Sequence, residues 1–277
     1  MRFIIPMLLL AAAAHAEPAT RPAKWSVRVI GTISAKGIDE SSGIIASRRF
    51  PGVYWTHNDS GNPAIVFAID RAGKHVGRFS VNVPNIDWED IAIDDAGRLY
   101  IADIGNNDGG RKSVTIHQFD EPNPAAGADK PGRLKVRRSW RLAYPADPFD
   151  SEAFFVWQGH GYLISKLLTG AQAEVYRFPL DAKEDPAKLE RVARLPIRSP
   201  VTAADISADG QRLAVLSILG LNVFDINGDI AAASKATPRY VRLFHPNIEA
   251  CCFVPDGVLM TSEKRQIYLV GEQAGDR

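Results

Sequence analysis

The sequence contains only two cysteines, Cys251 and Cys252, and they are neighbours. Adjacent cysteines bridge only with unusual backbone geometry, so the chain lacks a disulfide framework and must rely on its buried core. We expect two buried apolar thiols, with a strained disulfide between them as the alternative.

The chain also lacks an excess of charge, because 33 Lys and Arg residues are balanced by 32 Asp and Glu residues. Its basic residues form no cluster interleaved with aromatic residues. This balance argues against a nucleic acid or an anionic membrane surface as partner.

Long apolar runs are missing beyond the start of the chain. The run at residues 3–14 follows Arg2, is too short to span a bilayer and leads into Ala14-His15-Ala16, a pattern that signal peptidases cleave. We therefore expect residues 1–16 to be a signal peptide. Residues 17–277 are then expected to form one monomeric domain, without a membrane span, in the periplasm or outside the cell.

What the sequence does contain is a repeat: a carboxylate-rich start, an apolar strand, a glycine turn and a second apolar strand. It occurs at residues 40–44, 87–91, 150–154, 202–206 and 247–251. With Ser42, Glu89, Glu152, Ala204 and Glu249 taken as equivalent, the spacings are 47, 63, 52 and 45 residues. Such spacings are typical of propeller blades.

Further strands complete each repeat. Third strands are predicted at residues 65–69, 114–119, 174–178, 221–226 and 266–270, and fourth strands at 75–83, 134–142, 189–195 and 240–244. Residues 120–133 are expected to form a surface loop and residues 230–235 a short helical turn. The last repeat has no fourth strand of its own, and the alternating segment 25–33 is expected to supply it and close the ring.

The sequence thus predicts an all-β fold, a five-bladed β-propeller with four-stranded blades. A six-bladed ring is the alternative, and it would need a further repeat that the sequence does not show.

Two sets of polar residues are expected to share one face, because the first two strands of each blade run antiparallel. The first set stands where the inner strands begin and comprises Glu89, Glu152 and Glu249, with Glu40, Asp87, Asp150, Thr202 and Asn247 two residues earlier. The second set ends the second strands and comprises His57, Asp103, Lys166, Ser217 and Glu263. The alternative role for such carboxylates is to cap backbone amides at blade junctions. The loops at 58–61 and 105–108 are interpreted as turns.

Several of these segments carry a family resemblance, notably Glu-Ser-Ser-Gly at 40–43, His-Asn-Asp-Ser-Gly at 57–61 and Asp-Trp-Glu-Asp-Ile-Ala at 87–92. In them the chain resembles a group of secreted bacterial β-propeller proteins of largely unassigned function. It is more distantly similar to the gluconolactonase and regucalcin-like propellers and to the phytase-like esterase propellers, which generally have six blades. This resemblance implies acidic and amide side chains near the channel that bind a divalent cation.

Crowded glutamates repel one another unless they are protonated, paired with a cation or neutralised by a metal ion. We favour a hydrolase of esters, phosphoesters or glycosides, with a small molecule or carbohydrate as ligand. The candidate catalytic residues are Glu89, Glu152, Glu249, His57 and Lys166. The candidate ligands for Ca²⁺ or Mg²⁺, which prefer oxygen, are Glu89, Asp103, Glu152, Asp205, Glu249 and Glu263.

The alternative function is a non-catalytic envelope protein that binds a sugar, a small ligand or a protein partner through the same face. In that case Trp55, Trp88 and Trp157 are candidates for stacking on a sugar ring, and packing between blades is their other role.

Overall fold

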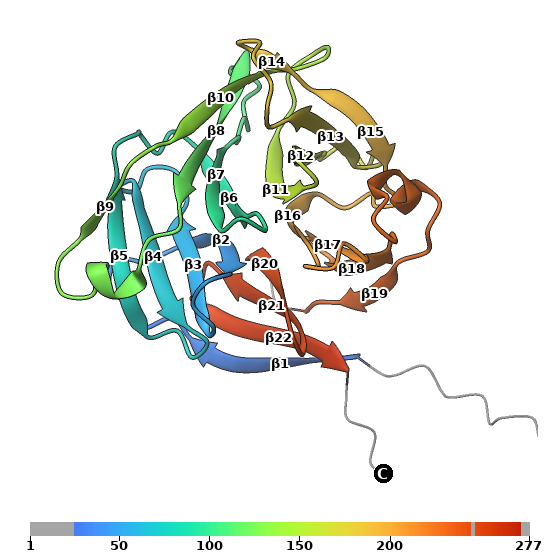
Figure 1. The fold of residues 1–277 in the computed structure, drawn as a ribbon. Coiled ribbons are helices and arrows are strands. Elements are labelled where there is room, and N and C mark those ends of the chain that lie inside the picture. The colour runs from blue at the N-terminus through green and yellow to red at the C-terminus, as the bar shows by residue number, and fades with distance from the viewer. Residues whose placement is uncertain (1–24, 245–246, 273–277) are drawn as a thin grey trace, which may run out of the picture.

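The computed structural model describes residues 25–244 and 247–272 of the chain (Figure 1). Five β-sheets stand around a central axis as the blades of a propeller, which confirms the predicted all-β, five-bladed fold. In the described part of the chain, no helix has the length and apolar character needed to cross a membrane. The expected signal peptide, residues 1–16, lies outside the described residues.

Each blade is numbered from its inner strand outwards. Blade one contains β2 (Ser41–Ala46), β3 (Val53–Asn58), β4 (Ile65–Asp70), β5 (His75–Val81) and β9 (Gly132–Leu134). Blade two contains β6 (Trp88–Ile93), β7 (Arg98–Asp103), β8 (Ser113–Asp120), β10 (Arg138–Ala143) and β14 (Ala187–Lys188). Blade three contains β11 (Ser151–Trp157), β12 (His160–Ser165), β13 (Glu174–Pro179) and β15 (Glu190–Arg194). Blade four contains β16 (Val201–Ile206), β17 (Arg212–Ser217), β18 (Gly220–Asp225) and β19 (Arg239–Arg242). Blade five contains β20 (Ile248–Val254), β21 (Gly257–Ser262), β22 (Gln266–Glu272) and β1 (Trp25–Thr32).

The N-terminal strand closes the ring, as predicted. β1 pairs antiparallel with β22, from Trp25 opposite Glu272 to Thr32 opposite Gln266. The inner strands then touch in the order β2, β6, β11, β16 and β20, with β20 returning to β2. Because the first and last parts of the chain share one sheet, β22 is paired on both of its edges.

The prediction of one fourth strand at residues 134–142 is wrong. Leu134 ends β9, which runs parallel to β5 and extends blade one, whereas β10 begins only at Arg138 and belongs to blade two. The segment between β8 and β9 is also more than a surface loop. It contains a 3₁₀ helix, η1 (Pro124–Gly127), which packs against β5 and carries the chain from blade two back to blade one. A second 3₁₀ helix, η2 (Ile230–Ser234), lies where a helical turn was predicted.

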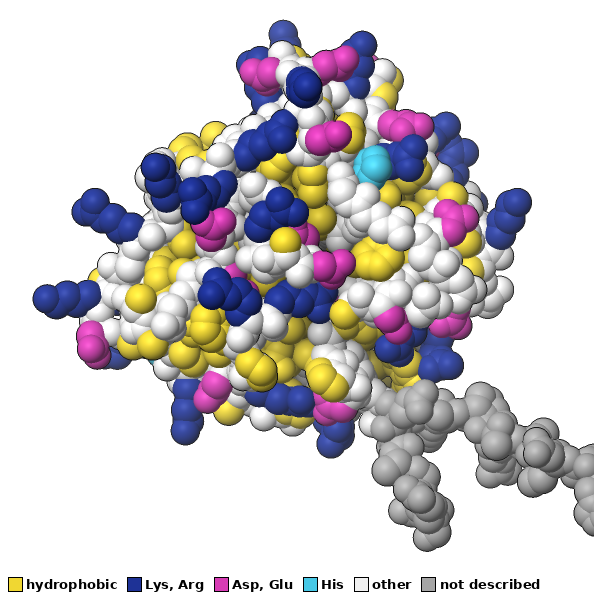
Figure 2. Space-filling model, in the orientation of Figure 1, with side chains coloured by type: hydrophobic (Ala, Val, Ile, Leu, Met, Phe, Trp, Pro, Cys, Tyr) yellow, Lys and Arg dark blue, Asp and Glu magenta, His cyan; other side chains and the backbone are white. Residues whose placement is uncertain are grey.

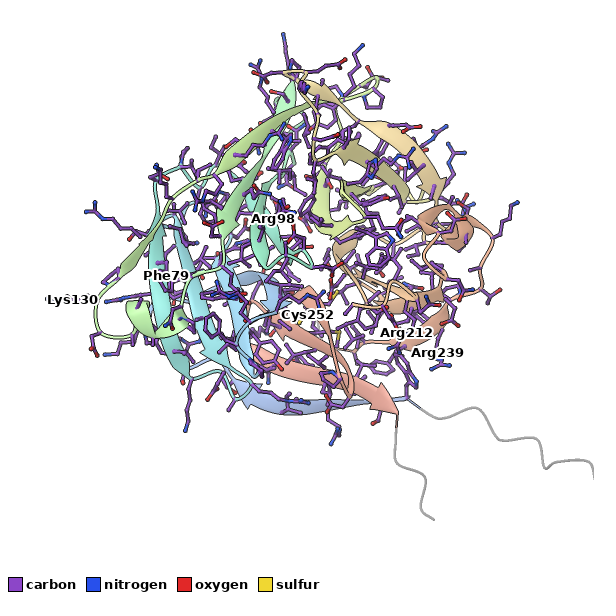
Figure 3. The ribbon with its side chains drawn as sticks, viewed as in Figure 1. Phe79, Arg98, Lys130, Arg212, Arg239 and Cys252 are labelled. Carbon is purple, nitrogen blue, oxygen red and sulfur yellow. The ribbon has the colours of Figure 1, made fainter. Side chains whose placement is uncertain are left out.

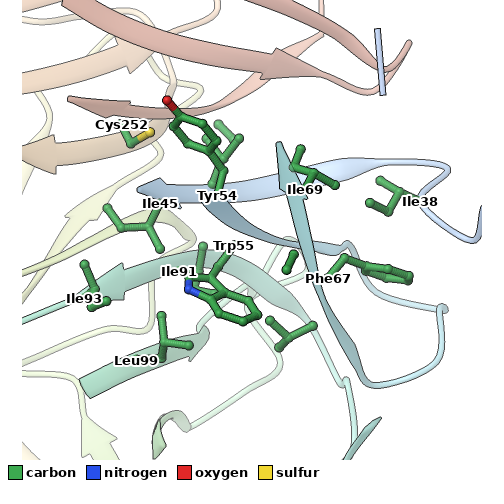
Figure 4. Packing of buried hydrophobic residues seen from close by; sticks show 14 of the residues in the cluster. Ile38, Ile45, Tyr54, Trp55, Phe67, Ile69, Ile91, Ile93, Leu99 and Cys252 are labelled. Atoms are coloured by element: carbon green, nitrogen blue, oxygen red, sulfur yellow. The ribbon is translucent and has the colours of Figure 1, made fainter. Parts of the chain in front are cut away.

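The inner strands are apolar because neighbouring blades cover both of their faces. Every residue of β6 and of β16 is buried, which explains why their apolar residues occur on both faces of the strand rather than on one. Figure 4 shows the packing: Cys252 of blade five, Ile45 and Trp55 of blade one and Leu99 of blade two belong to one cluster. The core thus lies between the blades, where burial of each such side chain contributes about 1.5–3 kcal/mol.

Cys251 and Cys252 are free thiols and are buried. Cys251 packs with residues of blades four and five such as Leu216 and Met260, whereas Cys252 packs towards blade one. Burial raises the pKa of both thiols. Their environment is that of apolar side chains, as expected.

Candidate functional site

A β-bulge marks the same point of each inner strand. The pairing between the first and second strands of a blade skips one residue near the start of the inner strand. The skipped residues are Ser42, Glu89, Glu152, Thr202 and Glu249. Because a bulge re-aims the side chain of its extra residue, the three glutamates are directed away from the regular pleat at one end of the channel.

This register corrects the alignment of the fourth repeat. Thr202 occupies the bulge, so Ala204 is not the equivalent of the glutamates, and Pro200 takes the place that had been assigned to Thr202. The second set of polar residues also mixes register positions. Asp103 and Ser217 lie opposite the first residue of their inner strands, Lys166 and Glu263 lie one residue beyond that position, and His57 lies one residue before it.

Three carboxylates meet where blades one and two adjoin. Asp59 follows β3, Asp87 precedes β6 and Glu89 is the bulge residue of β6. One oxygen from each carboxylate lies within 4.8 Å of the others. Gly105 has no side chain, and this leaves room for the carboxylates. A Cβ atom on this residue would stand 2.2 Å from Oε1 of Glu89 and 2.3 Å from Oδ2 of Asp87.

Glu89 is the most strongly perturbed member of this group. Its residue is only 5% exposed. Burial, followed by the negative charges of Asp59, Asp87 and Asp150, raises the pKa of Glu89 to about 10. Without an added cation this side chain is therefore a neutral acid at pH 7.

Lys166 supplies positive charge at the centre of the acidic end. Its ammonium group donates a hydrogen bond to Glu152, the bulge residue of blade three. Burial raises the pKa values of the surrounding acids, and Lys166 opposes that rise at each of them, namely Asp59, Glu89, Asp150 and Glu249. These acids come from blades one, two, three and five, so their side chains converge on the axis.

Asp150 joins blades two and three at this end. Its Oδ1 atom accepts a hydrogen bond of 2.8 Å from the backbone amide of Asn106. Asn106 in turn is held by Tyr144, whose hydroxyl accepts from the side-chain amide at 3.1 Å. Asp150 thus fixes the loop after β7 while its charge adds to the acidic end.

Glu249 forms an acid pair with Glu263. The side-chain amide of Asn247 donates to Oε2 of Glu263, whose carboxylate neighbours Glu249. Burial and the adjacent Glu263 raise the pKa of Glu249 to about 7. A cavity of about 130 Å³, also lined by Thr202 and Ser217, lies beside Glu249.

Asp103 and Asp205, which the sequence suggested as metal ligands, hold the protein framework instead. Asp103 is buried and forms a 2.7 Å ion pair with Arg111, which also donates to the carbonyl of Gly105 at 2.7 Å. Asp205 accepts backbone amides of Ile206 at 2.9 Å and Phe253 at 2.7 Å. Asp205 therefore joins blades four and five and is not brought together with Glu89.

The structure also places His57 away from substrate reach. The imidazole is 0% exposed, contacts the edge of Trp88 and lies 3.0 Å from the carbonyl of Asn58 through Nδ1. Burial lowers its pKa to about 4, so the ring is neutral. This enclosed neutral imidazole makes no contact with the channel mouth, and the catalytic role expected for it stays a prediction.

The tryptophans pack between blades and do not form a stacking platform. Trp55 and Trp88 are both 0% exposed. The indole of Trp157 donates to the carbonyl of Gly228 at 3.3 Å and covers Gly210, where a Cβ atom would stand 2.0 Å from the ring. The role of these three side chains is therefore packing between blades.

Asp59 is the acid that sequence analysis overlooked. The motif Asn58-Asp59-Ser60-Gly61 reads as a turn, and Asp59 does accept the amide of Ser60 at 2.5 Å. It nevertheless stands one residue beyond the strand end, as Lys166 and Glu263 do in their blades. Counting one residue past each second strand is the signal that would have found it.

The opposite end of the channel is chemically different. Two cavities of about 490 and 220 Å³ there mix both signs of charge: Arg48 and Arg212 line the larger with Asp205 and Asp209, and Arg48 and Arg98 line the smaller with Asp94 and Asp95. In the orientation of Figures 2 and 3, Arg98 lies near the middle of the ring, and Lys and Arg side chains gather around the centre of the visible face. The carboxylate of Asp94 there is bonded to Arg98 and Tyr100.

Comparison with known proteins supports the fold and goes no further. No family model matches the chain, and no curated protein matches its sequence. The PQQ-bound aldose sugar dehydrogenase of Streptomyces coelicolor is similar, with a TM-score of 0.52 and 11% identity over 91% of this chain and 99% of that one. A gluconolactonase from Xanthomonas campestris has a TM-score of 0.47 and 13% identity over 84% and 72% of the two chains. At such identities the likeness shows a β-propeller and leaves the chemistry to this chain's own residues.

Proposed function

We propose that the chain is a hydrolase whose reaction takes place at the acidic end of the channel, on an ester, phosphoester or glycoside. The observation that carries this proposal is the acid pair Glu249–Glu263 of blade five beside a cavity, with the Lys166–Glu152 ion pair of blade three at the same end of the channel. General acid–base hydrolysis needs one group that donates a proton and one that accepts it.

In this proposal the pair Glu249–Glu263 handles the proton. Glu263 is oriented by Asn247, and burial together with the adjacent Glu263 raises the pKa of Glu249 to about 7, so one carboxyl group of the pair activates water while the other protonates the leaving oxygen. Lys166 stabilises the negative charge that develops on the substrate. Its ammonium group is positioned by the ion pair with Glu152 and lies near enough to Glu249 to affect its pKa. Glu89 has no part in this proton transfer.

A panel of chromogenic esters, phosphoesters and glycosides tests the hydrolase. Turnover of one class by the wild type, reduced at least about a hundredfold in Glu249→Gln and in Lys166→Met, is the expected result. Asp95→Asn, on an exposed residue at the opposite end of blade two, is the matched control and should keep full turnover. Equal turnover in Glu249→Gln and the wild type would remove the acid pair from the mechanism.

A non-catalytic binding protein is the second candidate. The burial of His57 favours it, because that imidazole is unable to contact a substrate. In this case no substrate of the panel turns over, while a sugar or small polar ligand raises the melting temperature of the wild type and not of Lys166→Met.

We also propose that the chain is exported after cleavage of residues 1–16. The support is the short apolar run that ends in Ala14-His15-Ala16. Mass spectrometry of the protein expressed with its full N-terminus should find Glu17 as the first residue in the periplasmic or extracellular fraction. Uncleaved protein in the cytoplasm would contradict export.

A further inference from the structure

The carboxylates of Asp59, Asp87 and Glu89 form a compact oxygen cluster at the junction of blades one and two. Their nearest oxygens lie within 4.8 Å of one another, and they come from two blades that the ring holds in fixed register. A divalent ion with oxygen ligands at 2.3–2.6 Å fits between oxygens at that separation.

The state of Glu89 is a second and independent observation. Its residue is 5% exposed, and among the described residues no protein group donates a hydrogen bond to its carboxylate. Other buried acids of the ring behave differently. Asp90 accepts the amides of Ile91 and Phe154 at 2.9 Å each, and Asp205 also accepts two amides. Buried polar side chains in native proteins nearly always have a hydrogen-bond partner, so the unpartnered carboxyl group of Glu89 points to a partner outside the chain.

Gly105 keeps that space open. A methyl group on this residue would overlap both Glu89 and Asp87, at 2.2 and 2.3 Å from their oxygens. Arg111 holds the backbone here through the carbonyls of Gly105 and Asp103, at 2.7 and 3.2 Å. The loop after β7 therefore forms the floor of the cluster and fixes the two blade-two carboxylates above it.

We propose that Asp59, Asp87 and Glu89 bind one hard divalent cation of the Ca²⁺ type. The donors are all oxygens, and the two ligand types that favour Zn²⁺ are absent from the cluster: His57 is enclosed beside Trp88, and the two cysteines are buried in the interblade core. Ca²⁺ accepts irregular oxygen sets more readily than Mg²⁺, which demands near-octahedral geometry. The site stands whether or not the protein is a hydrolase, because it is defined by equilibrium binding.

Titration calorimetry of the whole, chelator-treated protein with CaCl₂ and with MgCl₂ tests the site. We expect one saturable Ca²⁺ site with a dissociation constant between about 10⁻⁵ and 10⁻³ M, and weaker Mg²⁺ binding. Asp59→Asn and Glu89→Gln should weaken Ca²⁺ binding by at least about tenfold. Gly105→Ala removes neither charge nor ligand and should weaken binding similarly, because its methyl group displaces two of the ligands.

Two charge-matched variants serve as controls, and far-ultraviolet circular dichroism verifies that every variant is folded. Glu263→Gln removes a carboxylate of the same face, and Asp95→Asn removes one at the other end of blade two. Both should bind Ca²⁺ within about threefold of the wild type. Glu263→Gln also separates the two proposals, because it should abolish hydrolysis and keep Ca²⁺ binding. The absence of a saturable Ca²⁺ site at about 10 mM, or equal weakening by Glu263→Gln and Glu89→Gln, would overturn the cation site.

Discussion

At the scale of single residues, the buried carboxylates differ in what their oxygens accept. Asp90 reaches backbone amides in blades two, three and four, at 2.9, 2.9 and 3.4 Å. Asp205 does the same between blades four and five. Both fit the structural role of joining inner strands. None of the residues that the structure describes donates a hydrogen bond to the carboxyl group of Glu89, the residue next to Asp90, so sequence proximity alone does not separate the two roles.

Replacement of Asp205 by Ala tests this assignment. Two buried amides, those of Ile206 and Phe253, would lose their acceptor. We expect the free energy of unfolding, measured by urea denaturation, to fall by about 2 kcal/mol or more, with Ca²⁺ affinity unchanged. Asp95→Ala, on an exposed acid, is the control and should change stability by less than about 0.5 kcal/mol. A loss of Ca²⁺ affinity without a loss of stability would restore Asp205 as a ligand.

His117 predicts a pH dependence of stability. It lies on β8 with Nδ1 at 2.8 Å from Oγ of Ser139, and burial lowers its pKa from 6.5 to about 4. On acidification His117 binds a proton near pH 6.5 in the unfolded chain but only near pH 4 in the folded chain. The contribution of His117 is therefore complete above pH 6.5 and is lost as the pH falls towards 4, by at most about 3 kcal/mol.

His117→Gln retains a side chain able to bond to Ser139 and does not titrate. Urea denaturation at pH 7.5 and 4.5 should show that the wild type loses more stability on acidification than the variant does. Because all other titrating groups are common to both proteins, identical losses would mean that His117 is not held neutral in the fold.

How far the site was predictable depended on one-residue details. Glu89, Glu152, Glu249 and Lys166 were found by sequence because each follows a recognisable strand pattern, and they do converge in the structure. Asp59 was missed because an Asx turn and a ligand position share the same sequence signal. The burial of His57 and Asp205 was not predicted, because burial depends on the neighbouring blade, which a single repeat does not encode.

At the scale of elements, the alternation of apolar runs and glycine turns predicted where the strands lie. It did not predict which strands pair with each other. β9 and β10 read as one strand, residues 134–142, yet they pair with different blades. The five bulges were also invisible, since a bulge adds one residue without changing composition. The second polar set was counted unevenly for another reason: the count began at the first residue of β3, at the second of β7 and β17, and at the third of β12 and β21.

The closing strand β1 provides the clearest test at this scale. It pairs with β22 along its length and helps to cover Tyr268 and Val270 through Trp25 and Val27. Deleting residues 1–32 should lower the melting temperature markedly and promote association, because the edge of β22 and its apolar face become exposed. Deleting only residues 1–24 is the control and should leave the melting temperature unchanged. A monomeric 1–32 deletion with the melting temperature of the control would refute closure by β1.

At the scale of the whole molecule, the channel joins two unlike ends. Carboxylates from four blades converge at one end, whereas the cavities at the other are lined by arginines and acids together. The chain has a net charge of only +1, so this separation of an acidic end from a mixed one is a property of the fold and is absent from the composition. Closed rings keep such a separation rigid, because each inner strand is packed between two others.

Rigid closure also predicts that the ring opens as one unit. Cys251 and Cys252 face the two sides of β20, one towards blade four and the other towards blade one, so each reports a different interblade junction. In Cys251→Ser and Cys252→Ser, the remaining thiol should react with Ellman's reagent under native conditions at one common rate, equal to the rate of global unfolding, because neither junction opens alone. The β1 deletion should accelerate both reactions together. A thiol of Cys252 that reacts much faster than that of Cys251 would instead show that blade five separates from blade one while the rest of the ring stays folded.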